Sequence, residues 1–418
     1  MIFALWLVLL TWQSSSKAAG KGDESQPGAR KTCPDTCHKY GTCNEELGRC
    51  DCPRGWKGPD CSQAPAEPND ACRQYAFKAD EDCVDGVPLN LCLNNCNGLG
   101  KCRGGWCHCD KGYWGADCSL SWGEGGRPAL LAGQGYVPRA KKPLIYVYEL
   151  PPKYNIYFNM RRNDRPLMFM FWQRLLSSGA RTADPEAADY FLVPMSQRGP
   201  GDSLLLVDAL EYIRSHWPWW DRLQGHRHII IQTGDTGRAE MARGPIATTA
   251  NATFITHWGL TEDYEFSGWR ASHRPLQDIV VPIYIGAMHQ RTGGLQESPL
   301  HPLHKAKAVK KKDIQLLFAG RICGGREAPN TTSVPNCRPI NKGYSQGVRQ
   351  LVHQLHWNRT GFSVKMHNPH YFEELQRTRF CLAPTGGGHG HRQILVAFSG
   401  CVPLLISDYV LQPFEPEL

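Results

Sequence analysis

The spacing of apolar residues changes along the chain and predicts its elements. From residue 143 onward, continuous apolar runs alternate with segments whose apolar residues recur roughly every three or four positions. The runs predict strands at residues 144–150, 190–195, 228–234, 278–285, 314–321, 363–366, 380–384 and 401–407. The intervening segments predict helices at residues 166–179, 203–217, 343–357, 368–378 and 392–400. Continuous apolar strands separated by helices indicate parallel sheets covered on both faces.

This alternation occurs twice in succession, so we expect an α/β fold with two Rossmann-type lobes, an N-terminal lobe at residues 143–310 and a C-terminal lobe at residues 311–418. In the helix expected at residues 343–357, one face carries four apolar side chains and is predicted to be buried. These side chains are Val348, Leu351, Val352 and Leu355.

The chain begins with an apolar run from Ile2 to Trp12, followed by small residues. The run is shorter than the roughly 18 residues that a membrane-spanning helix needs. Residues 1–20 are therefore predicted to be a signal peptide, with a signal anchor as the alternative.

Cysteines set residues 33–118 apart, because 14 of the 18 cysteines lie there. Six cysteines in residues 33–62 are followed by a near-copy in residues 92–119, which indicates a repeated small module. The spacings are not those of paired zinc ligands, so we interpret them as disulfide frameworks formed in an oxidising compartment. Linkers are expected at residues 63–91 and 120–142, and Cys72 and Cys83 in the first of them are expected to pair.

The other cysteines are sparse. Cys323 and Cys337 are close enough in sequence to bridge a loop, and Cys381 and Cys401 are expected to be buried thiols on neighbouring strands. Three sequons, at Asn251, Asn330 and Asn358, agree with passage through the secretory pathway. The net charge of +8 suits an anionic small ligand or a polyanionic chain, but it is too diffuse to indicate nucleic acid as a partner.

The stretch from Cys381 to Asp408 carries the clearest candidate chemistry. A predicted strand ends at Pro384, the sequence TGGGHGH follows, and a predicted helix begins near Arg392. Glycines allow a close backbone approach to a ligand, and an arginine at a helix start can bind phosphate. We therefore predict a diphosphate site at residues 385–392, although a glycine-rich turn made only for packing would look similar. Neither the P-loop nor the dinucleotide fingerprint fits, which argues against a P-loop hydrolase or a dehydrogenase.

Each cysteine module resembles the EGF-like domain, with an aromatic residue and a glycine before its last cysteine. Acidic residues that would indicate calcium binding do not precede either module. The resemblance implies that the first cysteine pairs with the third, the second with the fourth, and the fifth with the sixth. The implied pairs are Cys33–Cys43, Cys37–Cys50, Cys52–Cys61, Cys92–Cys102, Cys96–Cys107 and Cys109–Cys118.

Residues 143–418 resemble the exostosin family of glycosyltransferases. The resemblance lies in YVYELPPKYN, ADYFLVPM, DIVVPIY, LLFAGR, RFCLAPTGGGHGHRQ, GCVPLLISD and PFE, in that order. It implies a GT-B-like pair of lobes, a nucleotide-sugar donor bound mainly by the C-terminal lobe, and an inverting transfer to a glycan or glycoprotein acceptor in the Golgi lumen or membrane. It also implies a set of donor-binding residues, namely Arg321, Gly386, Gly387, Gly388, His389, Arg392, Ser407 and Asp408.

An inverting transfer needs a base near the acceptor hydroxyl. Asp235, Glu149 and His257 follow or end predicted strands and are the candidates, although turn, cap or core roles would also suit them. No metal site and no firm cofactor is predicted, and a divalent metal beside the donor is left open.

A second interpretation is a secreted, non-catalytic glycan-binding or adhesion protein with EGF-like modules and a degenerate transferase lobe. Two features favour it. Leu395 stands where many members of the family carry an acidic residue, and the chain stops at Leu418, where a GT-B lobe is expected to continue.

Overall fold

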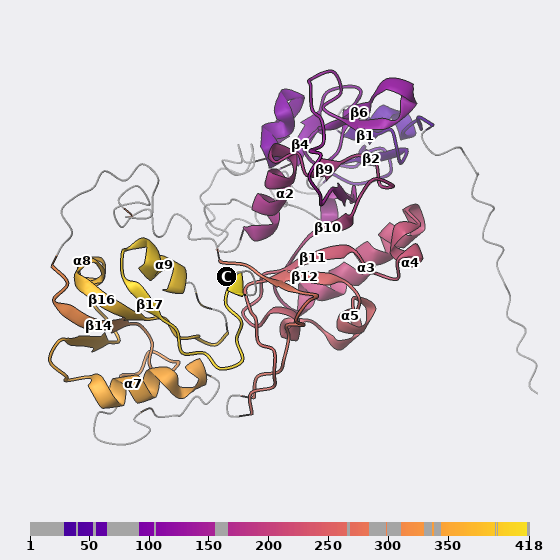
Figure 1. Ribbon diagram of the computed structural model, residues 1–418. Coiled ribbons are helices and arrows are strands. Elements are labelled where there is room, and N and C mark those ends of the chain that lie inside the picture. Colours follow the sequence, from indigo (N-terminus) through magenta and orange to yellow (C-terminus); the bar gives the residue numbers. More distant parts are fainter. Residues whose placement is uncertain are drawn as a thin grey trace, which may run out of the picture.

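The computed structural model describes residues 29–38, 41–52, 56–64, 92–103, 106–154, 166–265, 268–283, 298, 311–329, 337, 344–388, 390 and 392–415. Two α/β lobes lie side by side, and a pair of small modules packs on the N-terminal lobe (Figure 1).

The N-terminal lobe contains a six-stranded sheet in which all neighbouring strands are parallel. Its spatial order is β13 (Ile279–Val280), β12 (Thr253–Thr256), β11 (His228–Gln232), β10 (Tyr190–Gln197), β8 (Ile145–Val147) and β9 (Arg181–Thr182). Its helices are α2 (Leu167–Ser177), α3 (Pro200–His216), α4 (Trp219–Arg222) and α5 (Arg243–Thr248). Strands β9 and β12 were not predicted from the apolar runs.

Both faces of this sheet are buried, as the continuous apolar strands predicted. Alternate residues of β8 enter different cores: Tyr146 packs with α3 and α4, whereas Ile145 and Val147 pack with α2. The side chains of α3 that reach its core are those at the predicted helical spacing, Leu206, Ala209, Leu210 and Ile213.

The C-terminal lobe contains a four-stranded parallel sheet. Its spatial order is β15 (Phe362–Lys365), β14 (Ile314–Ala319), β16 (Thr378–Leu382) and β17 (Val402–Leu404). Its helices are α7 (Val348–His356), α8 (Tyr371–Arg377) and α9 (Arg392–Phe398). Side chains of α7 pack on one face of this sheet, and side chains of α8 and α9 pack on the other.

The predicted buried face of α7 is wrong in part. Val348 and Val352 pack against the sheet, but Leu351 and Leu355 are 55% and 60% exposed. The helix is turned so that polar side chains beside this stripe are buried instead. The buried polar side chains are Arg349, Gln350 and His353.

Each N-terminal module is built around three disulfides. The first contains β1 (Thr42–Asn44) and β2 (Arg49–Asp51), and the second contains β3 (Gly100–Arg103) and β4 (Trp106–Cys109). The disulfides are the six pairs that the resemblance implied: Cys33–Cys43, Cys37–Cys50, Cys52–Cys61, Cys92–Cys102, Cys96–Cys107 and Cys109–Cys118.

The second module packs into the N-terminal lobe and is not a separate domain joined to it only by a linker. Leu93, Trp106 and Ala116 belong to the same core as α2. The predicted linker at residues 120–142 is also structured in part, because it contributes two strands to a sheet with the module. This sheet consists of β5 (Tyr113–Trp114), β6 (Leu120–Trp122) and β7 (Pro128–Leu130).

Two more disulfides lie in the C-terminal lobe. Cys323 and Cys337 form the expected loop bridge. Cys381 and Cys401 are also bonded, so the prediction of buried thiols was wrong. Cys381 lies in β16 and Cys401 directly precedes the neighbouring β17, which brings their Cα atoms to 6.0 Å. Cys72 and Cys83 lie outside the described residues. Within the described ranges, no helix combines the length and the apolar character needed to cross a bilayer.

Candidate functional site

The order of the C-terminal sheet places its topological switch point between β14 and β16. The chain passes from β14 to β15 on one side, and then returns across β14 to form β16 on the other. Ligands of open parallel sheets bind beyond the carboxyl ends of the strands at such a point. The loops that begin there are those after Ala319 and after Leu382, and they contain the predicted donor-binding residues.

The segment after β17 connects the two lobes. The backbone N–H of Leu411 donates to the carbonyl of Gly259 at 2.9 Å, and the N–H of Thr261 donates to the carbonyl of Tyr409 at 2.9 Å. In Figure 1 this segment runs from the C-terminal sheet to the edge of the N-terminal lobe near β12. These bonds hold the N-terminal lobe against the loops at the switch point.

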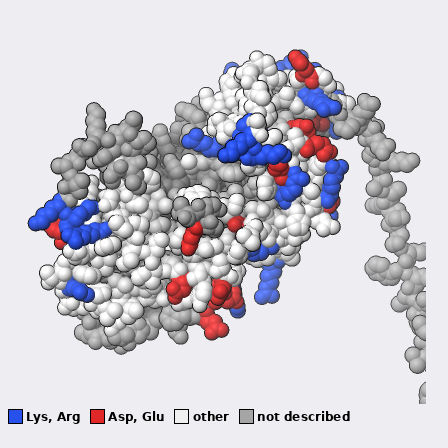
Figure 2. All heavy atoms as spheres, viewed as in Figure 1, with Lys and Arg blue, Asp and Glu red and all other residues white. Residues whose placement is uncertain are grey.

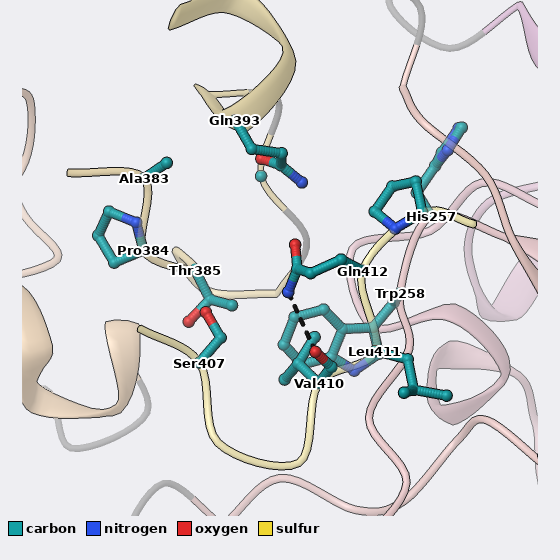
Figure 3. Close-up of a pocket in the computed structure, with 12 residues that line it drawn as sticks. His257, Trp258, Ala383, Pro384, Thr385, Gln393, Ser407, Val410, Leu411 and Gln412 are labelled. Atoms are coloured by element: carbon teal, nitrogen blue, oxygen red, sulfur yellow. Dashed lines mark hydrogen bonds between the residues drawn. The ribbon is translucent and has the colours of Figure 1, made fainter. Parts of the chain in front are cut away.

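A crevice between the lobes lies beside these contacts. Figure 3 shows Thr385 and Ser407 on one side of it and His257 on the other, with Gln393 and Gln412 reaching between them. The residues that line it come from both lobes: His257, Trp258, Ala383, Pro384, Thr385, Gly390, Gln393, Ser407, Val410, Leu411, Gln412 and Pro413.

The glycine loop touches the N-terminal lobe at a candidate base. A Cβ built on Gly388 would overlap the carbonyl group of Asp235, which follows β11. A Cβ on Gly386 would lie 3.4 Å from the Nη2 atom of Arg349, whereas a Cβ on Gly387 would meet nothing within 4 Å. Glycine is therefore required at Gly388 for the lobes to approach, and the structure brings the exposed Asp235 against the predicted diphosphate loop.

Arg392 points back over the end of β14. Its guanidinium lies 4.7 Å from the centre of the Phe318 ring, and its Nη1 donates to the Tyr371 hydroxyl at 3.0 Å. A Cβ on Gly320 would lie 2.7 Å from the Nη2 atom of Arg392. The small residue after β14 thus leaves room for this guanidinium at the switch point.

The other predicted donor-binding residues are distributed as follows. Arg321 is exposed beside the same point, Ser407 lines the crevice, and Asp408 is exposed, with its carbonyl accepting from the Gln346 side chain at 3.1 Å. His389 lies outside the described residues. Leu395 is a buried side chain of α9.

Sequence reasoning missed Arg349 at this place, and it included Thr385 only as the first residue of the predicted diphosphate site at residues 385–392. Arg349 is buried in the first turn of α7, and Thr385 lines the crevice with a buried hydroxyl that has no hydrogen-bond partner among the described residues. Arg349 is the one Lys, Arg, Asp or Glu residue in α7. A lone charged residue in this helix was the sequence feature that could have pointed to it. Thr385 carried no signal apart from its place beside the glycines.

The candidate bases occupy two different environments. His257 is buried at the crevice, with its Nδ1 3.0 Å from the carbonyl oxygen of Val281. Glu149 is not among the residues that line the crevice. Its carboxylate bonds to Arg181 at 3.0 Å and accepts the backbone N–H of Ala116 at 3.3 Å, so it faces the second module.

Burial raises the pKa of Glu149 to about 7, although Arg181 opposes this shift. Burial likewise opposes ionisation of Asp117, but Arg181 and hydrogen bonds from Ser119 and Asn94 hold the pKa of Asp117 below its ordinary value. One guanidinium therefore serves two carboxylates, and Asp117 is the one that stays ionised. The cluster of Glu149, Arg181 and Asp117 therefore suits a contact that holds the second module on the N-terminal lobe better than it suits a substrate-binding site.

Charges on the molecular surface are scattered. Figure 2 shows separate groups of basic and acidic side chains on the face in view, divided by broad uncharged areas. Of the sequon asparagines, Asn251 and Asn358 are exposed, and Asn330 lies outside the described residues.

Two Rossmann-type lobes that face each other across a crevice, with a glycine loop and an arginine at the switch point, define a GT-B-like fold. A family profile described as "Exostosin GT47 domain" matches residues 139–418, well over half of the chain. The chain belongs to the exostosin family. A second profile, described as "EGF-like domain", matches residues 33–61.

Curated relatives agree with this assignment. A probable glucuronoxylan glucuronosyltransferase of Arabidopsis thaliana is 29% identical over 293 residues, which are 65% of this chain and 58% of that protein. A probable glucuronosyltransferase of Oryza sativa subsp. japonica is 26% identical over 325 residues, 69% of each chain. A probable β-1,4-xylosyltransferase of Arabidopsis thaliana is 28% identical over 297 residues, 65% of this chain and 64% of that protein.

Proposed function

We propose that the protein is an inverting glycosyltransferase that moves a sugar from a nucleotide-sugar donor to a glycan acceptor during polysaccharide synthesis. The observation that carries the proposal is the contact between Gly388 and the backbone of Asp235, which brings the predicted diphosphate loop against a residue of the facing lobe that has an acidic side chain. The names of the relatives suggest a glucuronosyl or xylosyl group as the sugar transferred.

In the proposed reaction, the acceptor oxygen forms a bond to the anomeric carbon while the bond from that carbon to the diphosphate breaks. Asp235 takes the proton of the acceptor hydroxyl, and the leaving diphosphate keeps the electron pair of the broken bond. Arg392, with Arg321 beside it, offsets the negative charge that develops on the diphosphate. His257 is the second candidate for the base, because it lines the crevice between the lobes.

The proposed compartment is the Golgi lumen, with the N-terminal segment either removed or retained as an anchor. The eight disulfides among the described residues support an oxidising compartment, and the exposed Asn251 and Asn358 are open to glycosylation there. The alternative of a non-catalytic glycan-binding protein has no support from the relatives, and the assay below tests it.

The test is transfer by the full chain, produced by secretion. UDP-glucuronate and UDP-xylose are supplied with xylan oligosaccharides, and released nucleotide, product mass and anomeric configuration are measured. We expect an inverted product, and a rate lower by roughly 10²–10⁴-fold in Asp235→Asn. Asp221→Asn is the matched control, because Asp221 is an exposed ion-pair partner in the same lobe. Absence of both transfer and nucleotide binding in the wild type would favour the non-catalytic alternative.

A further inference from the structure

The C-terminal lobe buries a guanidinium for which the described residues supply no carboxylate. Arg349 is 8% exposed, and Arg181 and Arg238 are buried to a similar degree. Guanidinium nitrogens of Arg181 lie 3.0 Å from oxygens of two carboxylates, and a nitrogen of Arg238 lies 2.8 Å from a carboxylate oxygen. No described carboxylate is paired with Arg349. A buried charge without a counter-ion is costly, so the position of Arg349 calls for an anion from outside the chain.

Among the residues that the structure describes, only neutral groups accept hydrogen bonds from Arg349, and one of them is the carbonyl oxygen of Pro384, 3.5 Å from Nη2. Its Nη1 donates to the carbonyl oxygen of Arg321 at 2.9 Å and to the Tyr344 hydroxyl, while its buried Nε has no partner among the described residues. These bonds fix the direction of the guanidinium without neutralising it. The carbonyl it binds belongs to the loop after β14, so the side chain is held at the switch point.

A second cation lies close to the first. The guanidiniums of Arg349 and Arg392 lie 5.3 Å and 4.7 Å from the centre of the same Phe318 ring. Burial, with the charge of Arg392 added to it, lowers the pKa of Arg349 to about 10. Two neighbouring cations repel each other, and a ligand with two or more negative charges would relieve the repulsion of both.

We propose that Arg349 is a donor-binding residue that, together with Arg392, holds the diphosphate of the nucleotide sugar. The proposal rests on the function proposed above and extends its site to α7. Gly386 lies beside this guanidinium, since a Cβ there would be 3.4 Å from the Nη2 atom of Arg349, in ordinary van der Waals contact. A phosphate oxygen can use the space beside this glycine, and the free Nε of Arg349 offers it a charge-assisted hydrogen bond.

The test compares nucleotide affinities of the full chain by calorimetry, using UDP, UMP and uridine, and the guanosine series if the wild type prefers it. Arg349→Gln should weaken diphosphate binding by roughly ten- to a hundredfold and bring the affinities for UDP and UMP close together. Arg349→Lys keeps the charge and should fall between the wild type and Arg349→Gln. Arg359→Gln is the control, because Arg359 is an exposed arginine of the same lobe.

The outcomes separate this inference from the proposed function. If the wild type binds UDP or GDP and Arg349→Gln keeps its preference for the diphosphate over the monophosphate, Arg349 has no part in the site and the inference is wrong. If the wild type binds neither nucleotide, the proposed function fails as well. If Arg349→Gln does not fold, Arg349→Lys decides, since an unchanged ratio of UMP to UDP affinity in it would also overturn the inference.

Discussion

Gly388 sets how closely the glycine loop approaches the N-terminal lobe. A Cβ on Gly388 would overlap the carbonyl of Asp235, so Gly388→Ala must push the loop away from the N-terminal lobe. We expect overpacking to cost about 1–3 kcal/mol and to lower the melting temperature of the ligand-free protein. Gly387→Ala is the comparison, because a Cβ there meets nothing within 4 Å and should leave the melting temperature unchanged. Equal melting temperatures for the two variants would contradict the contact.

Also at the residue scale, the sequence pointed to those site residues that are neighbours along the chain, and it missed the one whose neighbours are distant in sequence. The glycine loop and Arg392 adjoin each other in sequence, and the structure places them at one switch point. Arg349 was missed because its significance depends on Phe318 and Arg321, which lie on another element. Glu149 has the same position relative to its strand as a catalytic carboxylate would have, but the neighbouring module covers it.

At the scale of elements, the Cys381–Cys401 disulfide ties the start of β17 to β16. Because the bond closes a loop with a sequence separation of 20, the Cys381→Ala/Cys401→Ala variant should lose about 2–4 kcal/mol of unfolding free energy. Chemical denaturation, monitored by fluorescence, measures this loss. Thiol labelling of the denatured, unreduced wild type provides a direct check, and labelling at Cys381 would show that the bond does not form.

The strands that the sequence predicted most clearly are long apolar runs, and the missed strand β9 is not. Long apolar runs such as that of β10 are unambiguous, because they are buried on both faces. Strand β9 has two residues, one of them Arg181, and is held by pairing with β8 rather than by its own apolar character. The exposed Leu351 and Leu355 of α7 show a different limit of sequence-based prediction. Helical spacing reveals a stripe of apolar side chains, but it does not show whether another element covers that stripe.

At the scale of the whole molecule, the modules and the N-terminal lobe form one body. Leu93, Trp106 and Ala116 of the second module lie in the lobe's own core, and its Asp117 binds Arg181 of β9. Cysteine spacing predicted the modules but could not predict this docking, because the surface that docks is made of apolar and charged residues between the cysteines. Loss of the second module should therefore destabilise the N-terminal lobe itself.

The docking contact makes a pH-dependent contribution to stability that can be isolated. The pKa of Glu149 is raised to about 7 in the folded protein, above its ordinary value of 4.5, so the folded state binds the proton more tightly. The contribution of Glu149 to the unfolding free energy is fully present below about pH 4.5 and is lost as pH rises through 7. The change is on the order of 3 kcal/mol across this window. Asp117 acts at lower pH, because its pKa lies below 3.8 and its contribution is lost only as pH falls through that range.

Glu149→Gln resembles the protonated side chain and cannot titrate. The unfolding free energy of the wild type should therefore fall relative to this variant between pH 5 and pH 8, so that the variant has its largest relative advantage at pH 8. Denaturation of both proteins at several pH values measures the difference, and Glu186→Gln, at an exposed ion pair, is the matched control. A constant difference between wild type and Glu149→Gln would mean that Glu149 does not titrate in this window.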